Sequence, residues 1–252
     1  MLKKAYEFFL FYNKIIFREG LGNYAWSLIM PLLIFVSIKI NWFFEKPSFN
    51  EAIVFFSAIW SYNIVNTYLF GFAGRISIFR ENGFLRSFTY VAGDKKPIIL
   101  SLFFTQILHG LITIIISTSV SAVLFNIDIF KLLFISVLSF FIVSVPISML
   151  MLVLVSLPIT TATLNSVGSI IMLPALFITM FRDGGGNEIV NALFLISPVE
   201  YVSLVCRALT DMVIYGNTRA DISLLLWISL IYIILGAFFW RFIKISSKTV
   251  RT

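Results

Sequence analysis

The stretch from Lys131 to Arg182 decides the fold class, because the fifty residues between these two carry no formal charge: KLLFISVLSFFIVSVPISMLMLVLVSLPITTATLNSVGSIIMLPALFITMFR. A helix needs ~20 apolar residues to cross a hydrocarbon core of ~30 Å. The stretch is therefore too long for one membrane span and long enough for two, and Pro158 with the threonines after it predicts the turn between them. Strands of a membrane barrel take only ~9–11 residues, so we expect helices.

The rest of the chain has the same character. Hydrophobic residues make up 60% of it, charged residues 12%, and the mean hydropathy is +0.99, whereas a soluble domain is about 45–50% apolar and ~25% charged. We therefore expect one all-α integral membrane domain over residues 1–252, without internal repeats or a soluble domain. Its six transmembrane helices are predicted at residues 21–40, 52–73, 98–125, 132–157, 161–181 and 222–240.

Residues 1–20 precede the first predicted span and are amphipathic. Their charges fall within about 100° of one another on a helical wheel, while most of the large apolar side chains lie elsewhere; these charged residues are Lys3, Lys4, Glu7, Lys14 and Arg18. The same charges interrupt the apolar run that a signal peptide would need. The pattern predicts a helix in the membrane interface; the alternative is a cytosolic extension of the first span.

The orientation follows from the distribution of basic residues. With the N-terminus inside, residues 1–20, 74–97 and 241–252 hold thirteen of the 19 Lys and Arg residues. Loops rich in Lys and Arg stay on the cytoplasmic side, so we expect a multi-pass protein of the cell membrane with both termini cytosolic. The formal net charge of +7 is then a topology signal and need not imply a nucleic-acid partner.

Residues that could carry catalysis are scarce. His109 and Cys206 are the only residues of their types, so we expect no catalytic constellation, no metal site and no internal disulfide. Lys never follows Gly in this chain, which excludes a Walker phosphate loop. The spans hold few ionisable residues, whereas ion-coupled carriers usually need them. The sequence thus indicates that any energy source lies in another protein and that this chain binds no cofactor.

The loop at residues 74–97 is the largest predicted cytosolic connection. Gly83, after Asn82, can end the preceding helix, and Asp94 can cap the following one. Between them Phe84, Phe88 and Val91 recur at i, i+4 and i+7, which predicts one apolar face of a short helix. Charges flank it at Arg80, Glu81 and Arg86. Such a helix suits the docking of a cytosolic partner; the alternative is an inert interfacial helix.

The segment at residues 182–220 is predicted to be external and reentrant. Pro198 divides the moderately apolar residues 188–211, and each half gives only ~16 Å of helix. If the segment crossed, the basic C-terminal tail would face outside, against the positive-inside tendency. We expect two half-helices that dip into the outer leaflet, preceded by a flexible loop that contains Gly184, Gly185 and Gly186.

Three of these features resemble the permeases of type-two ABC exporters. The stretch Arg80-Glu81-Asn82-Gly83-Phe84-Leu85 is similar to the family's R-E-x-G-x-L signature, with Phe84 where Thr is common and Ala92-Gly93 in place of a later Pro. The stretch Ser197-Pro198-Val199-Glu200-Tyr201, followed by Arg207, is similar to the family's Asn-Pro-x-x-Tyr…Arg segment, with Ser197 replacing Asn. The arrangement of Arg18, Trp26 and Pro31 resembles permeases that export polysaccharides.

The resemblance implies an ATP-driven exporter built from two permease subunits, identical or homologous, and two cytosolic ATPase subunits that hold ATP and Mg. It places ATPase coupling at Arg80, Glu81, Asn82, Gly83, Phe84, Leu85, Arg86 and Phe88, and a reentrant segment at Ser197, Pro198, Tyr201 and Arg207. The 28 Phe residues would suit a hydrophobic or amphipathic cargo, such as a drug-like compound, a lipid or an amphipathic peptide, although most rings would face lipid or other helices. Open alternatives are export of lipid-linked polysaccharide or teichoic-acid-type glycans, an ion-coupled carrier, a membrane-embedded enzyme, and a non-transporting sensor or assembly factor.

Overall fold

A computed structural model describes residues 1–18, 29, 32–34, 36–181, 194, 197–218 and 220–245. These residues form nine α-helices, three short segments of other helix types, and no strand. The α-helices are α1 (Leu2–Arg18), α3 (Phe49–Asn66), α4 (Arg75–Glu81), α5 (Phe84–Ala92), α6 (Lys96–Leu124), α7 (Ile129–Ser156), α8 (Thr161–Phe181), α10 (Pro198–Tyr215) and α11 (Ile222–Phe239). The others are the 3-10 segments η1 (Ile40–Phe43) and η3 (Trp240–Phe242) and the π-helical segment η2 (Thr67–Gly74).

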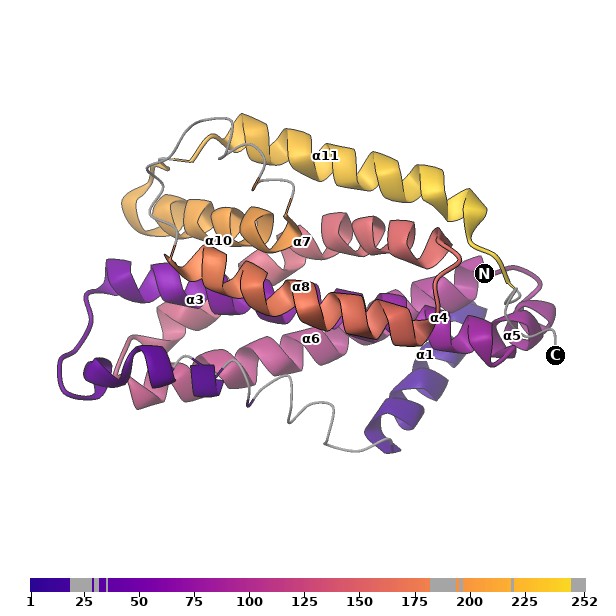
Figure 1. The fold of residues 1–252 in the computed structure, drawn as a ribbon, viewed down its shortest axis with the longest axis horizontal. Coiled ribbons are helices and arrows are strands. Elements are labelled where there is room, and N and C mark those ends of the chain that lie inside the picture. Colours follow the sequence, from indigo (N-terminus) through magenta and orange to yellow (C-terminus); the bar gives the residue numbers. More distant parts are fainter. Residues whose placement is uncertain are drawn as a thin grey trace.

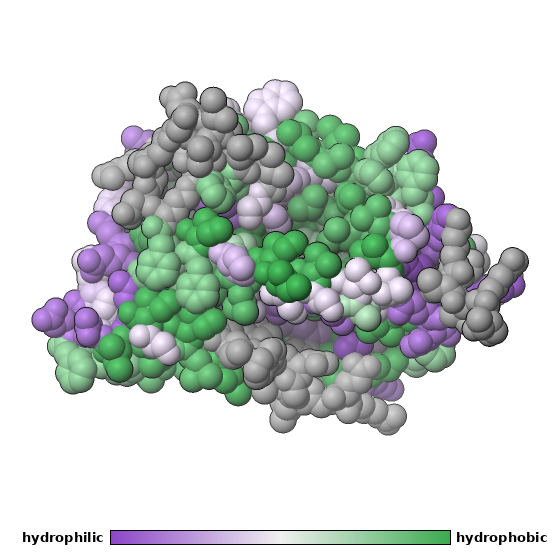
Figure 2. Space-filling view, viewed as in Figure 1, coloured by the Kyte–Doolittle hydropathy of each residue, from purple (hydrophilic) through white to green (hydrophobic). Residues whose placement is uncertain are grey.

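The chain is a multi-pass membrane protein. Five helices of the described part are long and apolar enough to cross a bilayer: Phe49–Glu81, Lys96–Leu124, Ile129–Ser156, Thr161–Phe181 and Ile222–Phe242. They confirm five of the six predicted spans to within a few residues at most ends. The remaining predicted span, which is the first in the chain at residues 21–40, falls mostly outside the described residues. Apolar side chains cover much of the middle of the visible face in Figure 2, and hydrophilic ones gather toward its two ends.

The second predicted span differs most from expectation. It continues past residue 73 to Glu81, because α3, η2 and α4 form one uninterrupted helix of 33 residues. At 1.5 Å per residue this helix is ~50 Å long, well beyond a hydrocarbon core of ~30 Å. Residues 74–81, expected in a loop, are instead the last two turns of this helix.

The long helices run side by side along the longest axis of the molecule (Figure 1). The N-terminus, α5 and the end of α11 lie together at what we call the α5 end of the bundle. The start of α3, the end of α10 and the start of α11 lie at the opposite end, where Tyr215 donates a hydrogen bond to Asn50. The spans differ in how much of each the rest of the protein buries: 72% of the most apolar stretch of α3–η2–α4 is buried, against 33% for α8 and 17% for α11. We therefore place α8 and α11 at the edge of this chain.

Close helix contacts in the core depend on small and polar residues, as in other membrane bundles. Between α3 and α6, the Trp60 indole N–H donates to Thr118 Oγ1 at 2.9 Å and Asn63 Nδ2 donates to Ser117 Oγ at 3.3 Å. Between α7 and α11, the missing side chain of Gly236 lets the two backbones meet next to Met149.

The predicted division of residues 188–211 at Pro198 coincides with the start of a helix. Pro198 occupies the first turn of α10, where its missing N–H removes no helical hydrogen bond. The helix runs on to Tyr215, four residues past the predicted end, and stops at Gly216 with a φ of 69°. The half-helix predicted before Pro198, apart from Phe194 and Ser197, and the predicted loop of Gly184–Gly186 fall outside the described residues.

Candidate functional site

The corner between α4 and α5 is set by a glycine. Gly83 has a φ of 74°, in the left-handed region that residues with a Cβ adopt only at a cost. The Asn82 N–H still reaches the Ile78 carbonyl at 2.9 Å, whereas Gly83 turns the chain out of the helix. The prediction that Asn82 and Gly83 end the preceding helix is thus confirmed. The turn starts α5 at Phe84, at the α5 end of the bundle (Figure 1).

The inward face of α5 differs from the predicted one. Leu85, Phe88 and Ala92 face the protein, with Leu85 fully buried. Val91, predicted on the apolar face, is 73% exposed, and Phe84 is half exposed. Both sets of residues have helical spacing and contain apolar side chains, so periodicity alone could not choose between them.

The face of α5 around Phe88 packs on α1 through aromatic rings. The Phe88 ring lies 5.5 Å from that of Phe8, 5.8 Å from that of Phe11 and 5.9 Å from that of Phe79. Ring pairs at these separations add roughly 0.5–1.5 kcal/mol each beyond the buried area. The cluster therefore ties α1 to the α4–α5 corner.

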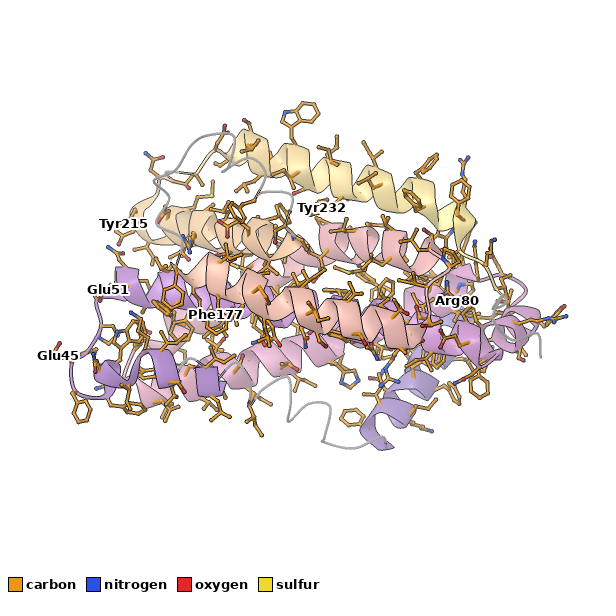
Figure 3. The ribbon with its side chains drawn as sticks, in the orientation of Figure 1. Glu45, Glu51, Arg80, Phe177, Tyr215 and Tyr232 are labelled. Carbon is orange, nitrogen blue, oxygen red and sulfur yellow. The ribbon has the colours of Figure 1, made fainter. Side chains whose placement is uncertain are left out.

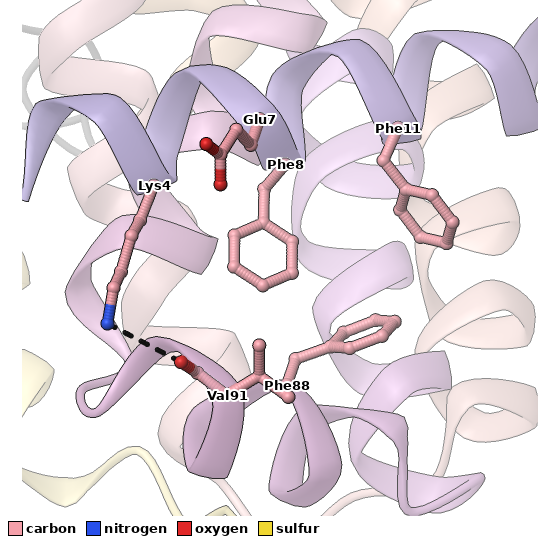
Figure 4. A pocket seen from close by; sticks show the side chains of 6 residues that line it. All are labelled: Lys4, Glu7, Phe8, Phe11, Phe88 and Val91. Carbon is pink, nitrogen blue, oxygen red and sulfur yellow. Dashed lines mark hydrogen bonds between the residues drawn. The ribbon is translucent and has the colours of Figure 1, made fainter.

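A groove of about 340 Å³ remains between α1 and α5 (Figure 4). Its lining residues are Lys4, Glu7, Phe8, Phe11, Phe88 and Val91. The Lys4 ammonium closes one end by donating to the carbonyls of Val91 at 3.4 Å and Ala92 at 3.0 Å. A cation is favourable there because the last carbonyls of a helix lack partners within it.

The outward face of α5 offers polar and aromatic groups. Arg86 and Tyr90 are exposed there, and the Arg86 guanidinium lies 5.8 Å from the Tyr90 ring centroid. Val91 is exposed at the edge of this face, where it also lines the groove toward α1. A second hollow, of about 440 Å³, is lined by Arg86, Thr89, Tyr90 and Ile245. This face combines charge, a ring and an apolar side chain without being covered by the rest of the described chain.

Arg80 and Glu81 do not share that outward face. Arg80 is 6% exposed, and its two terminal nitrogens donate to the carbonyls of Val155, Leu157 and Ile159 at 2.7, 3.1 and 2.6 Å. Glu81 Oε1 accepts the Thr161 N–H at 2.6 Å. The two residues thus bind the turn between α7 and α8. Figure 3 shows Arg80 toward the α5 end, with Glu45 and Glu51 at the other.

Lys95 makes a similar contact at the start of α6. Its ammonium donates to the carbonyls of Trp240 at 3.0 Å and Ile243 at 3.1 Å, at the end of the last helix. Burial lowers the pKa of Lys95, and the neighbouring Asp94 opposes that shift. Asp94 accepts the Lys96 N–H at 3.3 Å, but it lies one residue before the N-cap of α6, which is Lys95 and has no side-chain cap. Sequence reasoning missed Lys4 and Lys95, whose carbonyl partners lie more than 80 residues away.

The second predicted set of site residues lies on and just before α10, not beside α5. The Tyr201 hydroxyl and the Ser229 hydroxyl are 2.5 Å apart, linking α10 to α11. Arg207 Nε donates to Ser57 Oγ at 3.1 Å and Nη2 donates to the Thr179 carbonyl at 3.3 Å. Ser197 immediately precedes the helix and Pro198 starts it. The two sets are therefore separate, and this one joins α10 to α3, α8 and α11.

The described residues hold no cluster of three or more His, Cys, Asp or Glu side chains that could bind a metal ion. Cys206 is fully buried. His109 is buried too, with its ring 5.3 Å from that of Phe17. A packing role is sufficient for both.

Comparison of the chain with known protein families, curated proteins and solved structures finds no match. The function must therefore be argued from the sequence and the geometry above.

Proposed function

We propose that this chain is the membrane-spanning permease subunit of an ATP-driven exporter. It would act with a second permease subunit, identical or homologous, and with two cytosolic ATPase subunits that carry ATP and Mg. The observation that carries the proposal is α5: a short amphipathic helix, held at one end of a membrane bundle, whose outward face presents Arg86, Tyr90 and Val91.

The contacts that hold α5 against the rest of the protein support a coupling role. Its inward face is held by the ring cluster with α1, and Lys4 binds its last carbonyls. It follows directly on the 33-residue helix that ends at Glu81. A partner that moves α5 would therefore move a helix reaching through the membrane.

The charge distribution supports a cytosolic position for α5. Basic residues outnumber acidic ones among the described residues at the α5 end, including Lys3, Lys4, Arg86, Lys95, Lys96, Arg241 and Lys244. At the opposite end acidic residues prevail, including Glu45, Glu51, Asp128, Asp211 and Asp221. This asymmetry is the one expected when the α5 end faces the cytosol.

The sequence supports a separate source of energy, since it holds no phosphate loop. For the cargo we propose a hydrophobic or amphipathic molecule, such as a drug-like compound, a lipid or an amphipathic peptide. The outer surface of α8 and α11 is rich in large apolar side chains, among them Ile170, Phe177, Leu226 and Ile234. Such a surface suits contact with lipid and with a molecule that partitions into lipid.

The test is isolation of the intact complex from its native membrane. The purified chain alone should not hydrolyse ATP, whereas the complex should. Arg86→Glu should release the ATPase, because it reverses the charge that the outward face of α5 presents. Arg241→Glu is the matched control, since Arg241 is also exposed at the α5 end but lies on η3. Hydrolysis by the chain alone, or a complex equally stable with Arg86→Glu, would refute the proposal.

A further inference from the structure

Two neighbouring side chains of opposite charge form hydrogen bonds with the two ends of one turn. Arg80 and Glu81 form the last two residues of α4, and the turn at residues 157–160 joins α7 to α8. Arg80 donates to three carbonyls, one in the last turn of α7 and two in the connection that follows. Glu81 accepts the N–H of Thr161, the first residue of α8.

The signs of the charges match the groups that they meet. The last carbonyls of a helix and the first N–H groups of the next have no partners within their own helices, and they carry partial negative and positive charge respectively. A guanidinium on the carbonyls and a carboxylate on the N–H thus each satisfy an otherwise unpaired group. Hydrogen bonds to ionised partners are also shorter and stronger than neutral ones.

The position of this contact gives it a mechanical consequence. Gly83, only two residues beyond Glu81, starts the turn into α5. The chain connects α5 directly to α4 and α6, but it reaches α7 only through the whole of α6. The Arg80–Glu81 contact is a direct tie from the base of α5 to the α7–α8 turn.

We propose that Arg80 and Glu81 form a clamp that transmits movement of α5 to α7 and α8, and that neither side chain contacts the ATPase. This inference rests on the proposed function and assigns these two residues to the membrane side of the coupling path. It also separates them from Arg86, which lies six residues along but faces outward.

The clamp itself is tested on the purified chain by hydrogen–deuterium exchange of the backbone. Glu81→Ala should accelerate exchange roughly tenfold at the Thr161 amide, because the hydrogen bond of that amide to an ionised group is lost. Arg80→Met should accelerate exchange across residues 157–164, because the carbonyls that hold the turn lose their donor. Glu81→Gln should leave exchange near the wild-type rate, since the amide oxygen still accepts the Thr161 N–H. Arg86→Met is the matched control and should change nothing in this turn. Unchanged exchange in both Arg80→Met and Glu81→Ala would overturn the clamp.

Transmission is tested on the isolated complex with Mg and a non-hydrolysable ATP analogue. In the wild type and in Glu81→Gln the analogue should alter exchange at residues 157–164. In Arg80→Met the ATPase should remain bound in the same ratio while that response is lost. Loss of the ATPase from Arg80→Met or Glu81→Gln, or a full response in Arg80→Met, would overturn the inference. If no ATPase accompanies the wild-type chain, the proposed function and the transmission step fail together, whereas the exchange rates of the chain alone still decide the clamp.

Discussion

The substitution Gly236→Ala should loosen the packing of α11 on α7. A Cβ at this position would lie 2.6 Å from Met149 Cβ and 2.7 Å from the Met149 carbonyl carbon, and closer still to the carbonyl oxygen. Ordinary contacts of this kind begin near 3.4 Å. Because the obstacle is mostly backbone, no rotation of a side chain relieves it, and the two helices must separate by several tenths of an ångström or more.

Gly110→Ala is the matched control. Its Cβ would also come within 2.7 Å of the Phe140 ring and 3.0 Å of Thr67 Cγ2, but these are side-chain atoms, which shift more readily than the backbone of a packed helix. Both substitutions replace Gly by Ala inside a helix, so the gain in helix propensity, about 1 kcal/mol, is common to both. Overpacking typically costs about 1–3 kcal/mol, and we expect Gly236→Ala to be less stable than Gly110→Ala by an amount in that range.

Cys206 provides the assay, because the lone thiol is fully buried and becomes reactive only on unfolding. Heating the purified protein with a thiol-reactive fluorescent dye gives a midpoint for each variant. For a chain of this size 1 kcal/mol corresponds to about 2–4 °C, so Gly236→Ala should melt at least ~2 °C below Gly110→Ala. Equal midpoints, or a higher one for Gly236→Ala, would refute the close contact between α7 and α11.

Three further predictions concern the corner, a helix cap and the topology. Gly83→Ala should lower the free energy of unfolding by about 1–2 kcal/mol through the left-handed φ alone, since a Cβ there meets nothing within 4 Å. Gly83→Asn should lose less stability in the same thermal assay, and equal losses would argue against the conformational cause. Hydrogen bonds from Ser223 and Leu224 lower the pKa of Asp221 below its usual 3.8. The contribution of the Asp221 carboxylate to folding stability is therefore complete above that unfolded value and is lost as the pH falls through the lower folded pKa. Between pH 6 and pH 3 the wild type should lose more stability than Asp221→Asn, which keeps a cap that does not titrate. In a Cys206→Ser background, a cysteine at Asn217 should react with an impermeant thiol reagent on intact cells and one at Arg241 only after the membrane is opened; the reverse pattern would invert the orientation. The corresponding predictions at Asn187 and Ser247 concern positions outside the described residues.

Sequence reasoning located the spans well where the signal was long and local. The limits of α7 and α8 follow from the uncharged stretch between Lys131 and Arg182, because no soluble element needs so many apolar residues in succession. The helix end at Gly83 and the helix start at Pro198 could also be predicted, since each residue has a backbone property that few other residue types share.

The errors arose where charges have distant partners. Arg80 and Glu81 suggested a loop in place of a helix, because the residues that hold Arg80 and Glu81 lie about 75–80 positions further on. A local pattern carries no trace of such contacts, so the helix was ended too early. On α5, two equally spaced apolar sets left its inward direction undetermined.

Three of the basic residues at the α5 end serve two purposes at once. Lys4, Arg80 and Lys95 each donate to carbonyls at the end of a helix, namely α5, α7 and the α11–η3 segment. Lys3 and Lys96 are exposed and make no such contact with a helix end in the described structure. The second group can be exchanged or relocated during evolution so long as the total charge is kept, whereas a change in the first alters the orientation signal and opens a helix end together. Homologous chains should therefore vary freely at the exposed positions and retain a hydrogen-bond donor at the other three.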